Sequence, residues 1–144
     1  MTGLSHTNII DAVVDLWRSQ NVDLRPGADD NKLKFFEMTC GTKLPESFLY
    51  LYSLTNGMAS AMDDRMFTLW SFEEILQNNG ILKSSNTTVI FFGDFLIDSH
   101  RYYLLLDQEH ESIVADDYDE VVAENFEEFG QFLLTDPARL RLWT

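Results

Sequence analysis

Residues 44–57 read LPESFLYLYSLTNG, and this one stretch contains the start, the apolar body and the end of a predicted helix. Pro45 suits the first helical position, because a missing N–H costs nothing there and the proline φ is already helical. Phe48 and Tyr52 lie on one helical stripe, which neighbouring leucines broaden. Gly57 supplies a left-handed residue with which the helix can close. The stretch therefore predicts a short helix that is buried over most of its surface.

Composition favours one packed domain that binds neither nucleic acid nor membranes. The 144 residues are 45% hydrophobic and 13% aromatic, which is enough apolar material for a single domain spanning residues 1–144. The net charge is −14, so contact with phosphate backbones or anionic lipids is unfavourable over most of the surface. A basic protein is the favoured partner, because an acidic field raises its rate of encounter.

The sequence also favours a cytoplasmic protein. Cys40 is the single cysteine, so no internal disulfide can form. Residues 1–8 lack the basic region and the following apolar run of a signal peptide. The uncharged stretch at residues 47–62 is interrupted by polar side chains and is too short to span a bilayer. We therefore expect a location in the cytoplasm.

Two further helices are predicted before residues 44–57. An amphipathic helix over residues 9–18 follows a cap at Thr7 or Asn8. A second helix starts at residues 29–30 and ends at Gly41. The helix at residues 44–57 is thus the third.

The second half of the chain alternates strand patterns with short connections. Strands are predicted from β-branched and aromatic content at residues 66–70, 87–92, 101–106 and 112–115. Gly93-Asp94 is predicted to break the second of these strands. Because the connections are short and polar, antiparallel pairing is favoured.

Two more helices complete the pattern. A capping box at Ser71 starts a short helix that ends near Gly80, and Asn125 caps the last helix, which stops at Asp136-Pro137. The fold class is α+β, with a mainly antiparallel sheet packed against N-terminal helices and a C-terminal helix. Three apolar residues of the tail must dock on the body or remain exposed: Leu140, Leu142 and Trp143.

Motifs for catalysis, cofactors or metal ions are absent from the sequence. His6, His100 and His110 have no ligand spacing, and no nucleophile or phosphate-loop motif occurs. The polar cluster at residues 107–111 lacks the central glycine of a calcium loop and suits a hairpin turn. We therefore predict no enzyme activity, no catalytic residue, no cofactor and no metal ion.

The distribution of acidic residues suggests a binding surface for a basic protein. Between Asp94 and Glu128, 12 of the 24 acidic residues are opposed only by Arg101. In such a segment Tyr118 can anchor a partner while carboxylates steer it. The predicted partner-binding residues are Asp116, Asp117, Tyr118, Asp119 and Glu120, with Asp63 and Asp64 as a second patch. The alternative is a solvated, self-repelling loop face.

The order of these signals resembles the SUKH superfamily, which includes Smi/Knr-type cell-wall synthesis regulators and bacterial toxin-immunity proteins. The similarity covers most of the chain and lies in the order and spacing of motifs that are weak individually. These motifs are Leu44-Pro45, Asn56-Gly57, Phe92-Gly93-Asp94, Leu105-Leu106-Asp107, Val114-Ala115-Asp116 and VAENFEEF at residues 122–129. One departure is residues 95–100, which lack the glycines that family members often have in this connection.

The resemblance implies a SUKH-like α+β fold that acts by protein contact without enzyme activity. In bacteria such domains are mostly immunity proteins that bind and neutralise a toxin, often a nuclease. The acidic composition agrees independently, since a surface that binds phosphate is basic. The alternative is a regulatory scaffold similar to the cell-wall and glucan synthesis regulators. A metal-dependent hydrolase that uses two carboxylates is the least favoured hypothesis.

Overall fold

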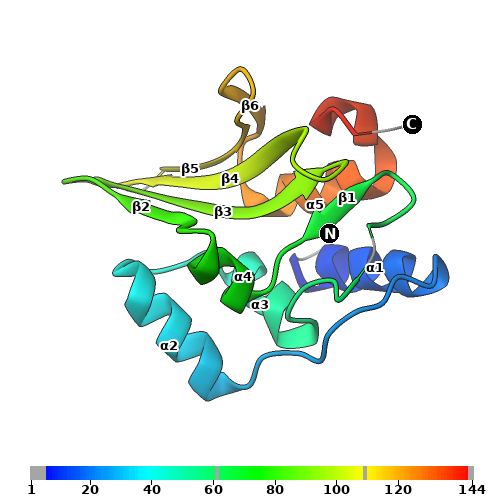
Figure 1. Cartoon of the computed structure of the whole chain (residues 1–144), viewed down its shortest axis with the longest axis horizontal. Helices are drawn as coiled ribbons and strands as arrows, with labels where there is room; N and C mark the ends of the chain where they lie inside the picture. The colour runs from blue at the N-terminus through cyan, green and yellow to red at the C-terminus, as the bar shows by residue number, and fades with distance from the viewer. Residues whose placement is uncertain (1–5, 61, 109, 143–144) are drawn as a thin grey trace, which may run out of the picture.

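The computed structural model describes residues 6–60, 62–108 and 110–142, with side chains from Asn8 onward. The helices are α1 (His6–Ser19), α2 (Asp30–Cys40), α3 (Glu46–Leu54), α4 (Phe72–Gln77), α5 (Phe126–Thr135) and the 3-10 helix η1 (Pro137–Leu140). The strands are β1 (Phe67–Leu69), β2 (Ile81–Lys83), β3 (Thr87–Phe95), β4 (His100–Asp107), β5 (His110–Ala115) and β6 (Glu120–Ala123). The predicted α+β class is confirmed, with helices before the sheet and a helix after it (Figure 1).

Within the described ranges, all strands belong to one antiparallel sheet with the order β1-β3-β4-β5-β6. The long strand β3 also pairs with β2, so β1 and β2 occupy opposite ends of the same edge. Phe95 of β3 lies opposite Phe67 of β1, whereas Ile90 lies opposite Ile81 of β2. The chain passes between these two positions through α4.

The core lies between one face of the sheet and the helices α1, α3 and α5 (Figure 1). The ring of Phe92 on β3 meets Phe126 and Phe129 of α5 at centroid distances of 5.4 and 5.3 Å. Phe48 of α3 contacts the same ring edge-on at 6.1 Å. α2 stands farther from the sheet and packs on α4, where Phe36 stacks on another buried aromatic ring. The opposite face of the sheet, called the outer face below, carries the site.

Helix α3 differs from its prediction at both ends. Pro45 has an extended ψ of 142° and directly precedes the helix, instead of forming its first residue. The helix ends at Leu54, because Thr55 is already extended, with a φ of −154°. Gly57 has a φ of +93°, but its role is a close approach, since a Cβ there would lie 2.6 Å from the backbone nitrogen of Ser71.

The predictions for the neighbouring helices are mostly confirmed. Asp29 caps α2 through its side chain and Gly41 ends it in a left-handed conformation. Ser71 forms the predicted capping box of α4, and Asn125 caps α5. The prediction for α1 is wrong at its start, because Thr7 and Asn8 lie inside this helix and not at its cap.

The prediction that Gly93-Asp94 breaks a strand is wrong. β3 continues through both residues to Phe95, with a register shift between Phe91 and Gly93 that marks a bulge. Gly93 is needed because β1 lies very close, so that an added Cβ would be 2.6 Å from the carbonyl oxygen of Thr68. The sequence prediction also omits the short strands β2 and β6.

The C-terminal tail docks on the body of the protein. Leu140 and Leu142 are buried, and the hydroxyl of Tyr102 donates a hydrogen bond to the carbonyl oxygen of Leu140. Trp143 lies outside the described residues.

Candidate functional site

The bulge in β3 places polar residues of three neighbouring strands side by side. Asp94 lies opposite Thr68 of β1 on one side and opposite Arg101 of β4 on the other. Side chains alternate along a strand, and Tyr102 of β4 faces the core. Arg101 and its register partners therefore belong to the outer face.

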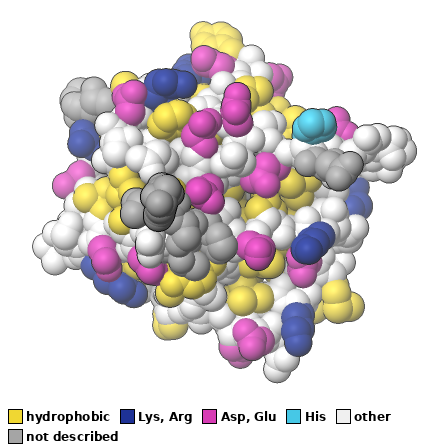
Figure 2. Space-filling model, turned by 180° about the vertical axis from the view of Figure 1, so that it is seen from behind, with side chains coloured by type: hydrophobic (Ala, Val, Ile, Leu, Met, Phe, Trp, Pro, Cys, Tyr) yellow, Lys and Arg dark blue, Asp and Glu magenta, His cyan; other side chains and the backbone are white. Residues whose placement is uncertain are grey.

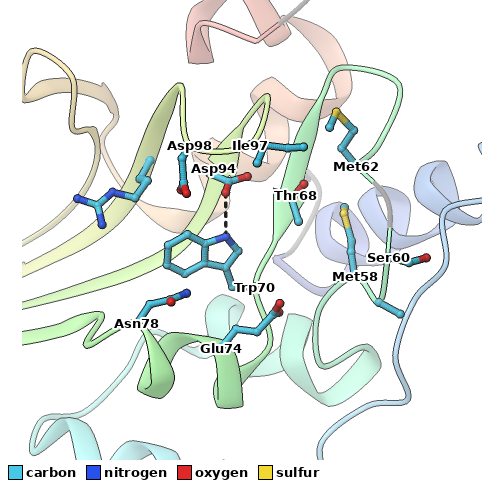
Figure 3. Close-up of a pocket in the computed structure, with 12 residues that line it drawn as sticks. Met58, Ser60, Met62, Thr68, Trp70, Glu74, Asn78, Asp94, Ile97 and Asp98 are labelled. Atoms are coloured by element: carbon cyan, nitrogen blue, oxygen red, sulfur yellow. Dashed lines mark hydrogen bonds between the residues drawn. The ribbon is translucent and has the colours of Figure 1, made fainter.

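These residues line a cavity of about 510 Å³ at the β1 end of the outer face (Figure 3). Its walls come from the loop after α3, from β1, from α4 and from the connection between β3 and β4. The lining residues are Met58, Ala59, Ser60, Met62, Thr68, Trp70, Glu74, Asn78, Asp94, Ile97, Asp98 and Arg101. In Figure 3, Trp70 lies between the labelled residues of α4 and those of the β3–β4 connection.

Trp70 and Asp94 form the polar centre of the cavity. The indole Nε1 donates a hydrogen bond to Oδ2 of Asp94 across 3.3 Å. Trp70 is fixed in turn, because its backbone N–H donates to Phe92 and its carbonyl oxygen accepts from the hydroxyl of Tyr52. The backbone of Trp70 is therefore held in place beside the carboxylate.

Asp94 is buried although it carries a carboxylate. Its exposed fraction is 7%, and its Oδ1 atom has no hydrogen-bond partner among the described residues. Burial raises the pKa of Asp94 to about 6. The Trp70 hydrogen bond lowers this pKa, the charge and the carboxyl group of the nearby Asp98 raise it, and the backbone N–H of Asp98 lowers it slightly. A buried carboxylate with a shifted pKa and a free oxygen is typical of a functional position.

The connection after β3 shapes the rim of the cavity. Leu96, Ile97 and Asp98 all have positive φ, at 48°, 53° and 66°. A branched residue such as Ile97 is strained in this region, which glycine adopts freely. The glycine-poor sequence of this connection thus forms a turn of unusual backbone geometry, and its tip holds Ile97 with an exposed fraction of 74%.

Arg101 links the cavity to the predicted acidic segment. Its Nε lies 2.9 Å from Oδ2 of Asp116, and its backbone N–H donates to the other oxygen of that carboxylate. Its guanidinium carbon lies 4.4 Å from the centre of the Phe91 ring. On the same strand, the hydroxyl of Tyr103 donates to Asp119 across 3.2 Å. The cavity and the acidic segment therefore border one continuous part of the outer face.

The acidic segment, residues 116–120, is brought together as one turn but is partly neutralised. Asp117 forms a double hydrogen bond with Arg141, which lowers the pKa of this aspartate. Glu120 lies 3.4 Å from the same guanidinium. Tyr118 is 81% exposed, and Arg141 lies over its ring. Residues 117–120 are all exposed, and the carboxylates of Asp117 and Glu120 face Arg141.

The second predicted patch is divided between the interior and the surface. Asp63 is 5% exposed, and its carboxylate accepts from the Trp17 indole and from two backbone N–H groups, those of Arg65 and Phe67. Burial raises the pKa of Asp63, and these hydrogen bonds lower it in part. Asp64 is exposed. Asp63 therefore orders the loop, and only its neighbour faces outward.

Acidic side chains are also common away from these segments. On the side of the molecule opposite to that of Figure 1, Asp and Glu are scattered across the surface between apolar and basic side chains (Figure 2). The acidic charge therefore extends beyond the 116–120 turn.

The described part of the chain offers no grouping of side chains for a metal ion, and its one cysteine is buried. No set of three or more His, Cys, Asp or Glu side chains is arranged there to hold a metal ion. Burial raises the pKa of the Cys40 thiol to about 12, which keeps it protonated. His100 is buried between Tyr102 and Asp117. No described helix has both the length and the apolar character to cross a membrane.

The sequence prediction omitted Trp70, Glu74, Asp94 and Asp98 as site residues. A signal was present for one of them, because Asp94 is a charged residue directly after an apolar strand pattern. The interpretation of Gly93-Asp94 as a strand break placed this carboxylate in a solvated loop. The bulge returns it to the sheet.

Comparison with known proteins identifies the family. The model of the SMI1 / KNR4 family (SUKH-1) matches residues 27–131, which run from the loop before α2 into α5 and include the whole sheet. A search of curated proteins found no match. The cavity and the acidic segment both lie inside the matched region. The chain belongs to the SMI1 / KNR4 family (SUKH-1).

Proposed function

We propose that this protein is an immunity protein that binds and neutralises a cognate toxin domain with a basic surface. The observation that carries the proposal is the turn at residues 116–120, which presents Tyr118 with an exposed fraction of 81% on a chain of net charge −14. Membership of the SUKH-1 family supports a role in protein contact. Binding occurs in the cytoplasm and involves no reaction of its own.

The mechanism is occlusion of the toxin surface. A standard interface covers about 800 Å² on each partner, so it extends beyond the turn and across the outer face. Tyr118 acts as the aromatic anchor, because exposed tyrosines that become buried carry much of the energy of such interfaces. Asp119, Glu120 and Asp64 supply local charge complementarity. Asp116 and Asp117 hold the turn in place through Arg101 and Arg141.

The test begins with the partner. The tagged protein is isolated from its own cells, the bound protein is identified, and its toxic activity is measured with and without the immunity protein. An inhibited toxin supports the proposal. A set of housekeeping proteins without a toxin overturns it and favours the regulatory scaffold.

Three variants then test the surface with the identified toxin. Tyr118→Ala should weaken binding by about 30-fold or more, as expected for a hot spot. The double variant Asp119→Asn, Glu120→Gln should weaken it by about tenfold at low salt and less at high salt. Asparagine is suitable at position 119 because this residue has a φ of +50°. Asp15→Asn on α1 is the matched control and should bind like the natural protein. Unchanged affinity and salt dependence in the first two variants would show that the turn is not the interface.

A further inference from the structure

The cavity beside Trp70 contains a buried carboxylate, that of Asp94, with one oxygen that lacks a hydrogen bond. Oδ2 of Asp94 accepts from Trp70, whereas Oδ1 has no hydrogen bond of ordinary length and angle among the described residues, and the residue is only 7% exposed. An unpaired buried carboxylate is costly, so proteins usually retain one for a purpose. A hydrogen-bond donor that carries positive charge would satisfy both this oxygen and the charge of the carboxylate.

Arg101 is the one basic residue among the described residues that line this cavity, and it is already engaged. Its Nε bonds to Asp116 at 2.9 Å, and its guanidinium carbon lies over the Phe91 ring at 4.4 Å. The remaining charged groups of the lining are Glu74 and Asp98, which add negative charge. The cavity is therefore acidic around a carboxylate that lacks a cation.

The size and lining of the cavity suit a long side chain with a flat cationic end. Its volume of about 510 Å³ lies within the range of about 300–1,000 Å³ found for ligand pockets. Met58, Thr68 and Trp70 provide apolar and aromatic wall, while Asp98 stands at the rim (Figure 3). Such walls accommodate the methylene groups of an incoming side chain, and carboxylates bind its charged end.

We propose that this cavity receives an arginine side chain of the protein partner, with its guanidinium bonded to Asp94 Oδ1 and Asp98 and resting against Trp70. Arginine fits better than lysine because its planar group bonds to carboxylates in pairs and stacks on aromatic rings. A phosphate or carboxylate ligand would meet three acidic groups. Oδ1 has almost no exposed area, so binding includes a small side-chain adjustment of the kind common at interfaces. The proposal rests on the proposed function in one respect, namely that the arginine belongs to the toxin.

The raised pKa of Asp94 agrees with this geometry. Without a cation, burial keeps the pKa of this carboxyl at about 6. A bound guanidinium favours the charged form and should lower that pKa towards its ordinary value.

The test uses short peptides as probes and NMR as the readout. Acetyl-Gly-Arg-Gly-amide is titrated into the full chain at pH 7.5, and the indole N–H signal of Trp70 is followed. The Trp17 indole is an internal reference, because it donates to the buried Asp63. We expect a saturable shift of the Trp70 signal, with a Kd of roughly 10 mM, because one side chain without the rest of an interface binds weakly. The matched peptide with citrulline, which has the same shape without the charge, should give no saturable shift.

Variants assign the effect to the carboxylates. Asp94→Asn should abolish the saturable shift, and Asp98→Asn should weaken it by about threefold. Asparagine tolerates the φ of +66° at residue 98, so the second variant keeps the loop intact. Asp15→Asn should bind the arginine peptide like the natural protein. Thermal unfolding of each variant confirms that it is folded.

The results separate this proposal from the immunity function. Equal shifts with the arginine and citrulline peptides, or an undiminished shift in Asp94→Asn, would overturn the cavity proposal and leave the toxin assay unaffected. Conversely, a specific arginine site in a protein that inhibits no toxin supports the cavity and contradicts the immunity role. A lysine peptide that binds more tightly than the arginine peptide would overturn the choice of arginine.

Discussion

At the level of single residues, Asp94 links stability to pH. Its pKa is about 6 in the folded protein against an ordinary aspartate value of 3.8, so the folded state binds the proton more tightly than the unfolded state. The stabilisation is complete below pH 3.8 and is lost as the pH rises through about 6. Ionised Asp94 therefore lowers the stability of the protein at neutral pH.

Asp94→Asn should remove this penalty. Asparagine keeps an acceptor for Trp70 and carries no charge, so the variant should be more stable than the natural protein at pH 7.5, by about 1–3 kcal/mol. The difference should shrink towards pH 4, where the natural carboxyl is protonated. Urea unfolding at both pH values measures it, with Asp15→Asn, an exposed position on α1, as control. A variant that is less stable at pH 7.5 would show that the carboxylate is paired in solution.

Asp63 differs from Asp94, because both oxygens of its buried carboxylate accept hydrogen bonds. It accepts from the Trp17 indole at 2.9 Å and from the backbone N–H groups of Arg65 and Phe67. Asp63→Ala leaves these donors unsatisfied and should lower the free energy of unfolding by about 2–4 kcal/mol. Asp64→Ala, one residue away and exposed, should stay within about 0.5 kcal/mol. Denaturant unfolding decides between this structural role and the predicted contact role of Asp63, since a contact residue would leave stability unchanged.

The predictability of single residues depends on how distant their partners are. The caps Asp29, Ser71 and Asn125 were predicted correctly, because each bonds to a backbone group three residues away. Asp63 bonds to the nearby backbone N–H groups of Arg65 and Phe67, but its burial also involves Trp17, which is separated from it by 46 residues. No local pattern in the sequence indicates the contact with Trp17.

At the level of elements, helices were easier to predict than strands. The helices α1, α2 and α5 are recognisable from apolar residues spaced three or four apart. The strands β2 and β6 are short and depend on pairing with β3 and β5. The bulge in β3 is also a tertiary feature, because it accompanies the close approach of β1 at Gly93. The cavity lies at this bulge, and its residues could not be predicted from sequence because the bulge depends on tertiary contacts.

The exit of α3 supports a prediction about glycine. Gly57 has a φ of +93°, and a Cβ would lie 2.6 Å from a backbone atom of Ser71, at the start of α4. Gly57→Ala should therefore destabilise the protein by about 2–4 kcal/mol, from strain and overlap together. Gly41→Ala is the comparison, because its φ is +70° but its closest contact is the flexible end of Lys83. It should cost about 1 kcal/mol. Equal losses in thermal or urea unfolding would contradict the close approach at Gly57.

For the whole molecule, the sequence predicted the fold class and the family but not the site's location. The motifs from Leu44-Pro45 to the last helix all lie within residues 27–131, the region that the family model matches. The net charge of −14 also follows directly from composition. The arrangement of that charge does not, because Arg101 and Arg141, distant in sequence, neutralise part of the acidic turn.

This arrangement of charge predicts which features of the protein set the association rate constant and which set the dissociation rate constant of the toxin complex. Of the 24 acidic residues, 20 lie outside residues 116–120, and acidic side chains are scattered over the face seen in Figure 2, so the field that attracts a basic toxin extends beyond the turn. The association rate constant should fall by about tenfold or more between 0.05 and 0.5 M NaCl. Tyr118→Ala should leave this constant within about twofold and act on dissociation, because an anchor contact forms after the encounter. Stopped-flow mixing with the identified toxin measures both constants. A variant that slows association without changing dissociation would show that Tyr118 acts in the encounter, and the turn would then guide the partner without anchoring it.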